Sequence, residues 1–378
     1  MNYFIVLTDK CDLTCSYCRG KVVGDKAGNP SNPSNPSNYS DEIEFLPSEI
    51  SYETWKLERF CRRDPDCGLI FYGGEPLLRI GKIIEIMERI PAKRFILQTN
   101  ALKLHDLPPK YVKMLNGIQI SIDGDKPLTD ANRGKGVYDS CISNASIARE
   151  RGFSGELIAR MTVTEDTDIY KQVMHLLTLG RSQLFDAVHW QLDSMFAPDY
   201  EKRQFAKWVK ESYNPGVTRL AEKWIDGLKK CRVMRIYPFL GIMQSLLNHK
   251  EAKLRCGAGY AHYAIQTDGN IVPCPVMTGM KRFYAGNLST DPKLLKQFNV
   301  KEPCIKCDIK SICGGRCLYA NVHDFWGEKG YTEVCYTVNH LVNTLKKIEP
   351  DVRYLIEKNK ITLKDLEYTK YNSCEIIP

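Results

Sequence analysis

Over its first 200 or so residues the chain alternates between short, continuously apolar runs and segments whose apolar residues recur at helical spacing. The apolar runs predict buried β-strands, and the segments between them predict helices. Strands are expected at 2–8, 67–74, 94–100, 117–124, 156–166 and 187–196, and helices at 48–62, 82–90, 140–152 and 170–180. Ser48 is the candidate N-cap of the first helix. This alternation predicts an α/β fold with a parallel sheet and right-handed crossovers, either a barrel or an open fan.

The pattern changes after this region. Residues 199–250 look mostly helical, with a break at Asn214-Pro215-Gly216, and residues 336–368 return to helix. Between Cys256 and Cys335, seven cysteines, many glycines and short strands replace the regular apolar pattern. The apolar content there is thin, which indicates a second domain organised around metal. We therefore expect a core at 1–198, a helical linker region at 199–255, a metal-binding domain at 256–335, and C-terminal helices and a tail at 336–378.

An Asn-Pro-Ser repeat runs from Asn29 to Ser37. Proline at every third residue, with asparagine and serine, is typical of an exposed loop that packs no core. We expect an insertion at about 25–45 without chemistry of its own, and a lid that gates substrate access is the alternative.

The overall composition excludes several classes of protein to which this chain could belong. The chain has 378 residues, 43% of them apolar, and its net charge of +8 comes from scattered lysines and arginines. It has no apolar run long enough to span a membrane, and its basic residues form no tract of the kind that binds nucleic acid. The N-terminus lacks the basic region and cleavage site of a signal peptide. Fifteen cysteines, an odd number, then favour metal thiolates in a reducing, cytoplasmic compartment over disulfides.

The stretch CDLTCSYC contains three of these cysteines, Cys11, Cys15 and Cys18. A structural zinc site needs four ligands, and no fourth lies nearby. A 4Fe–4S cluster held by three cysteines keeps one iron open for another ligand. Placed on the loop after the first strand of a βα barrel, this motif resembles that of the radical S-adenosylmethionine (SAM) superfamily. The resemblance implies a partial (β/α)6 TIM-like barrel in which the three thiolates hold the cluster that binds SAM.

A second motif of that superfamily, GGEP, follows the second predicted strand as Gly73-Gly74-Glu75-Pro76. Glycines let backbone carbonyls approach the amino group of SAM, and Glu75 offers a compensating negative charge. The resemblance also implies SAM contacts at the ends of later strands. They are Thr99 and Asn100 near the ribose, Ser121 and Arg133 on the carboxylate, Tyr17 against the adenine, and also Asp123 and Arg160. No protein residue is assigned as catalytic, because the radical comes from SAM.

The C-terminal cysteines resemble those of the SPASM domain, which has two cysteines around a glycine, a CxxC-x5-C-x3-C block and a final cysteine. The resemblance implies two auxiliary 4Fe–4S clusters, and three in the whole chain. Auxiliary cluster II would be held by Cys304, Cys307, Cys313 and Cys335, and auxiliary cluster I by Cys256, Cys274 and Cys317. Fully ligated members have another cysteine soon after the first, which this chain lacks. Its fourth ligand is left open between Cys231, His262, the substrate and an unfilled iron.

Enzymes with both domains mostly modify peptides or proteins, and the chain is also similar to peptide-modifying members from methanogenic archaea. The resemblance implies reductive cleavage of SAM to a 5′-deoxyadenosyl radical and hydrogen abstraction from a peptide or protein, giving a thioether or C–C crosslink or a related oxidation. Because the first strand begins at residue 2, we expect no leader-binding domain before the cysteine loop. The expected partners are the substrate and a low-potential ferredoxin or flavodoxin, under anaerobic conditions.

Three alternatives stay open. A formylglycine-type sulfatase maturase ranks lower, because Pro275-Val276 follow Cys274 where such enzymes usually carry an acidic base. A maturase of a small-molecule cofactor precursor is the second. A non-catalytic electron carrier or zinc-binding scaffold is the third, although neither needs a SAM pocket.

Overall fold

The computed structural model describes residues 1–18, 44–180, 183–193, 203–323, 327–370, 374 and 376–378. Contacts divide the chain into two compact units. The first unit comprises Met1–Ile122, Thr129–Leu157 and Gly257–Asn299, and the second comprises Asp123–Leu128, Ile158–Cys256 and Val300–Pro378. The expected insertion at about 25–45 lies almost entirely outside the described residues.

The first unit is built on a sheet with a parallel core. Strands β4, β3, β2, β1 and β7 are parallel neighbours in that order, and β8 and β9 extend the sheet with antiparallel pairing. Their bounds are β1 Asn2–Val6, β2 Gly68–Tyr72, β3 Arg94–Thr99, β4 Gly117–Ser121, β7 His262–Ile265, β8 Asn270–Val272 and β9 Gly286–Asn287. The N-terminal strand is therefore interior, with β2 on one edge and β7 on the other.

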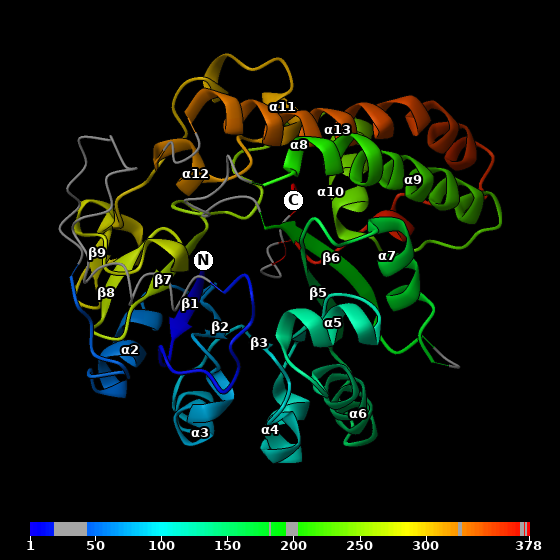
Figure 1. Ribbon diagram of the computed structural model, residues 1–378. Helices are drawn as coiled ribbons and strands as arrows, with labels where there is room; N and C mark the ends of the chain where they lie inside the picture. The colour runs from blue at the N-terminus through cyan, green and yellow to red at the C-terminus, as the bar shows by residue number, and fades with distance from the viewer. Residues whose placement is uncertain (19–43, 181–182, 194–202, 324–326, 371–373, 375) are drawn as a thin grey trace. The chain divides into compact units, whose positions relative to one another are not determined.

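Four helices of this unit connect or follow the parallel strands (Figure 1). They are α2 Thr54–Cys61, α3 Ile80–Arg89, α4 Pro109–Met114 and α6 Val137–Glu150. Consecutive residues of β2, such as Leu69, Ile70 and Phe71, are all fully buried. Burial of both faces of a strand is the reason why parallel strands read as continuous apolar runs.

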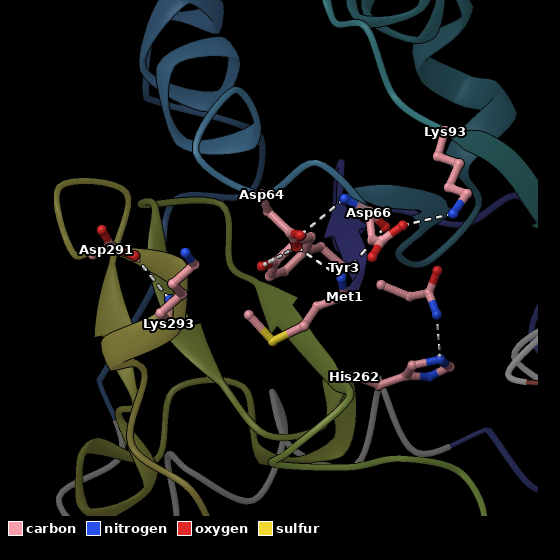
Figure 2. Close-up of polar contacts among 9 residues, drawn as sticks. Met1, Tyr3, Asp64, Asp66, Lys93, His262, Asp291 and Lys293 are labelled. Carbon is pink, nitrogen blue, oxygen red and sulfur yellow. Dashed lines mark hydrogen bonds and ion pairs between the residues drawn. The ribbon is translucent and has the colours of Figure 1, made fainter.

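The start of β1 is anchored by Asp64, an acidic residue that follows α2. The Met1 amino group donates to Asp64 Oδ2 at 2.7 Å, and the Tyr3 hydroxyl donates to the same oxygen at 3.0 Å. Figure 2 shows Asp64 between the two, and Lys93 paired with Asp66 at 2.6 Å. These contacts fix β1, and with it the beginning of the loop that carries the first three cysteines.

The second unit is mainly helical. Its helices are α7 Ile169–Leu177, α8 Phe205–Trp208, α9 Asn214–Lys229, α10 Tyr237–Asn248, α11 Lys310–Cys313, α12 Leu318–His323 and α13 Gly327–Glu357, and it contains β6 Ala187–Leu192. Strand β5 (Glu156–Val163), which pairs in parallel with β6, and helix α5 (Lys126–Arg133) contain residues of both units. Helix α13 packs on α9 and α10 (Figure 1). In the part of the chain that the structure describes, no helix has the length and apolarity needed to cross a bilayer.

All six predicted strands are present, and two local predictions were wrong. Ser48 does not cap α2, because its carbonyl accepts from the Asp9 amide at 3.0 Å and its hydroxyl contacts the Asp9 carboxylate. Helix α2 begins only at Thr54. The break predicted at Asn214-Pro215-Gly216 is instead a π-helical turn, Val209–Tyr213, that runs directly into α9. Pro215 has no N–H with which to continue the regular i→i−4 hydrogen-bond ladder, and the π-helical turn just before it is the irregularity at which the helix accommodates the proline.

The compact units do not follow the predicted region boundaries. Residues Gly257–Asn299 group with the N-terminal strands, since β7 pairs with β1. The boundaries at 198, 255 and 335 stay predictions.

Candidate functional site

The first three cysteines lie on the loop that follows β1. The side chains of Cys11, Cys15 and Cys18 are all partly exposed. The Cys18 amide donates to the Cys15 carbonyl at 3.0 Å, which closes a turn between these two cysteines. Burial, reinforced by nearby acidic groups and by Cys15, raises the pKa of Cys11 to about 11.

This trio has the donor set that a site-differentiated cluster requires. Three accessible thiols on one loop match the three protein ligands of a 4Fe–4S cluster that keeps one iron open. The raised pKa of Cys11 means that a thiolate there needs a cationic centre to stabilise it. The residues present therefore fit the group that the sequence predicts.

The GGEP motif packs directly against the beginning of the cysteine loop. The Gly74 amide donates to the Thr8 carbonyl and the Glu75 amide to the Lys10 carbonyl, both at 2.8 Å. A Cβ atom on Gly73 would overlap the Thr8 carbonyl oxygen, and one on Gly74 would overlap that of Lys10. Gly73 also has φ +147°, which disfavours any other residue. Both glycines are therefore needed to place the two loops side by side.

Glu75 connects the ends of β2 and β3. Glu75 as a whole is 1% exposed. One oxygen accepts from the Leu77 amide at 2.9 Å and the Thr99 hydroxyl at 2.7 Å, and the other accepts from the Asn100 amide at 2.8 Å. Burial raises the pKa of Glu75 to about 7, while these three donors work in the opposite direction. Pro76 follows as the first residue of a 3-10 turn, Pro76–Arg79.

Asp12 extends this network into the cysteine loop, and sequence reasoning missed it. The Asn100 side-chain amide donates to Asp12 Oδ1 at 2.7 Å. The Thr99 hydroxyl is engaged by Glu75 and by the Ala101 amide. The signal for Asp12 was its place beside the first cysteine, on a loop that has to be held against the strand ends.

Two more predicted SAM contacts lie together. The Arg133 guanidinium stands over the Tyr17 ring, 5.4 Å from its centre, and Arg133 is 6% exposed. The Ser16 amide donates to the Asn132 carbonyl at 2.9 Å, which ties the cysteine loop to the end of α5. Ser121 closes β4, and its carbonyl lies 3.7 Å from the Cys141 sulfur.

Asp123 and Arg160 belong to the second compact unit, whereas Tyr17, Glu75 and Arg133 belong to the first. Asp123 is fully buried, and its Oδ1 accepts from the Thr162 amide at 3.0 Å. Arg160 donates to Gln191 Oε1 at 2.6 Å. These contacts give both residues a structural task, and their proposed contact with SAM stays a prediction.

The second unit contains a pocket lined by the four cysteines predicted for auxiliary cluster II. Cys304, Cys307, Cys313 and Cys335 share this pocket, which α11, α13 and the neighbouring turns form. Cys317, which the sequence predicts for auxiliary cluster I, lines the same pocket. Burial, followed by the charges of the other three thiols, raises the pKa of Cys335 to about 12. The four sulfurs are thus close enough to repel one another when ionised.

Four converging thiols are the ligand set of a cysteine-ligated 4Fe–4S cluster, so the pocket fits that group. Arg316 also lines the pocket, and its charge lowers the pKa of Cys335 against the effect of burial. Within the described ranges, no group of three or more His, Cys, Asp or Glu is arranged to hold a single metal ion.

The trio predicted for auxiliary cluster I is divided between the units. Cys274 belongs to the first unit, whereas Cys256 and Cys317 belong to the second. Of the two candidate fourth ligands, Cys231 is exposed, and His262 is buried with its Nε2 3.0 Å from the Asn2 side chain. The joint ligation of one cluster by these residues stays a prediction.

A second charged group that the sequence did not point to lies at the carboxyl ends of β5 and β6. Arg203 is 3.1 Å from Glu165 and 3.8 Å from Asp193, and all three side chains are partly buried. The two carboxylates follow parallel strands, the edge where barrel enzymes bind their substrates. Only their position just after two apolar runs could have indicated them.

Comparisons with known proteins support the sequence interpretation. Residues 5–177 match the family model of the Radical SAM superfamily. A search of curated protein sequences found no significant match. Among solved structures, anSMEcpe with bound AdoMet and the Cp18Cys peptide is 18% identical with a TM-score of 0.65, and the match covers 93% of this chain and 99% of that one. Streptococcus suis SuiB bound to its precursor peptide SuiA is 17% identical with a TM-score of 0.54, covering 85% and 72%.

At these identities the solved structures show the fold, and they confirm the predicted class of α/β core with a C-terminal extension. The family model covers the cysteine loop, the GGEP motif and the strands up to α7. Residues 5–177 therefore match a radical SAM domain, the family that the cysteine and GGEP motifs predict.

Proposed function

We propose that this protein is a radical SAM/SPASM enzyme that modifies a peptide or protein. The observation that carries the finer part of this proposal is the pocket lined by Cys304, Cys307, Cys313 and Cys335. Cleavage of SAM needs only the cysteine loop and its surroundings, so a second thiol-lined pocket supports an enzyme with auxiliary clusters. The solved structures of similar fold include two with bound peptides, anSMEcpe with Cp18Cys and SuiB with SuiA.

The residues of the first unit have distinct tasks in this proposal. Cys11, Cys15 and Cys18 hold a 4Fe–4S cluster, and Tyr17 and Arg133 form one wall for the adenine and carboxylate of SAM. Glu75 fixes the ends of β2 and β3. In this proposal its carboxylate also supplies the negative charge for the amino group of SAM. When bound, the cluster and SAM supply a 5′-deoxyadenosyl radical that takes a hydrogen atom from the substrate.

The auxiliary sites belong to the same proposal. Cys304, Cys307, Cys313 and Cys335 hold one cluster, and Cys256, Cys274 and Cys317 hold another whose fourth position is open or filled from elsewhere. If His262 is that fourth ligand, ligation through Nδ1 would leave the contact of its Nε2 with Asn2 in place. A low-potential ferredoxin or flavodoxin, and an anaerobic cytoplasmic setting, complete the proposal.

The test is anaerobic reconstitution with iron and sulfide, followed by SAM and dithionite. We expect 5′-deoxyadenosine from the wild type, and none from a variant with Cys11, Cys15 and Cys18 all changed to Ala. That variant should retain the iron of the auxiliary clusters, whereas Cys304→Ala should lose auxiliary iron and keep the ability to cleave SAM. Wild-type protein with all its clusters and no 5′-deoxyadenosine would refute the enzyme proposal in favour of an electron carrier.

The substrate class needs a separate measurement. Peptides encoded by short reading frames beside the gene would be incubated with the reconstituted enzyme and analysed by mass spectrometry. Loss of two hydrogen atoms from a peptide, absent with the triple-alanine variant, is the expected result. Turnover of a small molecule with no change in any peptide would refute the peptide proposal and favour a cofactor-precursor maturase.

A further inference from the structure

Tyr331 lies against one of the four thiols of the second-unit pocket. Its hydroxyl oxygen is 2.7 Å from Cys304 Sγ, and the Tyr331 side chain lines the pocket together with all four cysteines. Tyr331 comes from the first turns of α13, and Cys304 opens the short helical turn Cys304–Lys306. Nothing in the proposed ligation uses this tyrosine.

The direction of the hydrogen bond follows from a second contact. Asn321, which is 8% exposed, points its side-chain amide at the Tyr331 hydroxyl from 3.4 Å. The same Asn321 side chain is held by the backbone of Lys301, through its oxygen at 2.5 Å and its nitrogen at 3.2 Å. An amide N–H can only donate, so it occupies a lone pair of the phenol oxygen. The phenol proton is then left for the sulfur, and a cluster-bound thiolate can only accept it.

The backbone supplies further donors to the same group of sulfurs. Cys313 Sγ accepts hydrogen bonds from the amides of Gly315 and Arg316. Gly314, Gly315 and Arg316 all have positive φ, at 74°, 91° and 46°. The backbone therefore adds two N–H donors to this group of sulfurs, at a different cysteine from the one that Tyr331 contacts.

We propose that Tyr331 tunes the reduction potential of the cluster held by Cys304, Cys307, Cys313 and Cys335, raising it by donating a hydrogen bond to the Cys304 sulfur. This inference rests on the proposed ligation of that cluster. An added electron increases the negative charge on the ligand sulfurs, so a donor at 2.7 Å stabilises the reduced state more than the oxidised one. Hydrogen bonds to the sulfurs are among the factors that set cluster potentials. Asn321 is then the positioning residue that orients the phenol.

The test is a redox titration of reconstituted, full-length Tyr331→Phe, followed by electron paramagnetic resonance. The Tyr331 change is introduced into the variant with Cys11, Cys15 and Cys18 changed to Ala, so that only the signals of the auxiliary clusters remain. We expect one signal to move to a lower midpoint potential while the iron content and the other signal stay unchanged. The matched control is Tyr354→Phe, which removes an exposed hydroxyl from the same helix and should move neither signal.

Equal midpoint potentials in Tyr331→Phe and the wild type, with iron fully loaded, would overturn the inference. If Tyr331→Phe fails to load iron, Asn321→Ala decides, provided that it loads iron fully, because it keeps the phenol and removes the donor to the phenol oxygen together with the contacts of Asn321 to the Lys301 backbone. A lower potential in Asn321→Ala supports the inference, and an unchanged one overturns it. A wrong assignment of the cluster would give a different result, because Cys304→Ala would then contain as much iron as the wild type.

Discussion

Glu75→Gln separates the structural role of this carboxylate from its proposed role in binding SAM. In the folded chain the pKa of Glu75 is raised to about 7 from its usual 4.5, chiefly by burial. Between these two values the folded state holds a proton that the unfolded chain has released. Stability contributed by this proton is present at low pH and is lost as the pH rises toward 7.

The size of this effect follows from the pKa shift. One pKa unit corresponds to about 1.4 kcal/mol, so between roughly pH 6 and pH 8 the wild type should lose about 1.3 kcal/mol of unfolding free energy through Glu75. Glutamine cannot ionise, so this loss disappears in Glu75→Gln. The variant has its own cost of about 1–3 kcal/mol at every pH. If the amide oxygen keeps the two contacts to Leu77 and Thr99, the amide nitrogen faces the Asn100 N–H, and two donors oppose each other.

The assay is anaerobic urea unfolding of cluster-loaded, SAM-free protein at pH 6 and pH 8, with SAM affinity measured by calorimetry. Glu150→Gln, an exposed change on α6, is the matched control and should keep the wild-type pH dependence. Removal of one partner from a buried ion pair costs about 3–5 kcal/mol, so SAM affinity should fall by a factor of about 100 or more in Glu75→Gln. An unchanged pH slope would refute the burial reasoning. An unchanged SAM affinity would instead refute the proposed contact with the amino group of SAM.

Two further changes probe the packing of each unit. In Gly74→Ala the new methyl group meets the Lys10 carbonyl, so the cysteine loop has to shift and we expect the protein to retain less of the SAM-cluster iron. The control is Gly81→Ala, whose added methyl group meets open space. Full retention of iron in Gly74→Ala would contradict the need for glycine. His189 is fully buried, and burial followed by the charge of Arg160 lowers its pKa well below 6.5. Stability should therefore fall as the pH drops below about 6.5, because the unfolded chain then binds a proton that the folded one does not. His189→Met should unfold with a flatter pH profile between pH 7 and pH 5, while His105→Gln, an exposed change, should not.

The strands and the cysteine motifs could be predicted from the sequence because each depends on local signals. Apolar runs such as Leu69–Phe71 carry the buried strands, and the ligand spacings are visible without a fold. The residues at which the helices begin and end were harder to predict from the sequence. Serine is a favoured N-cap residue, yet Ser48 makes a long-range contact with Asp9 and does not cap the helix. Such contacts cannot be predicted from a single segment of sequence.

Part of the site could also be predicted, but the supporting interactions could not. The motifs pointed to Glu75 and Asn100 as ligand contacts, whereas the structure shows them in one network with Thr99 and Asp12. Tyr331 had no signal at all, because its relation to Cys304 depends on how α13 packs across 27 residues of chain.

The pairing of β1 with β7 has a consequence for synthesis. During synthesis β1 is made long before β7, because the residue that pairs with Asn2 is His262, 260 positions further along the chain. One edge of that strand stays open until most of the chain has been made, and an open apolar edge is prone to aggregation. Any shortened form that ends before β7 would keep this exposed edge permanently. We therefore expect the cysteine-rich C-terminal region to be required for folding of the N-terminal half as well as for the reaction. The two regions should then not be exchangeable between related proteins as independent domains.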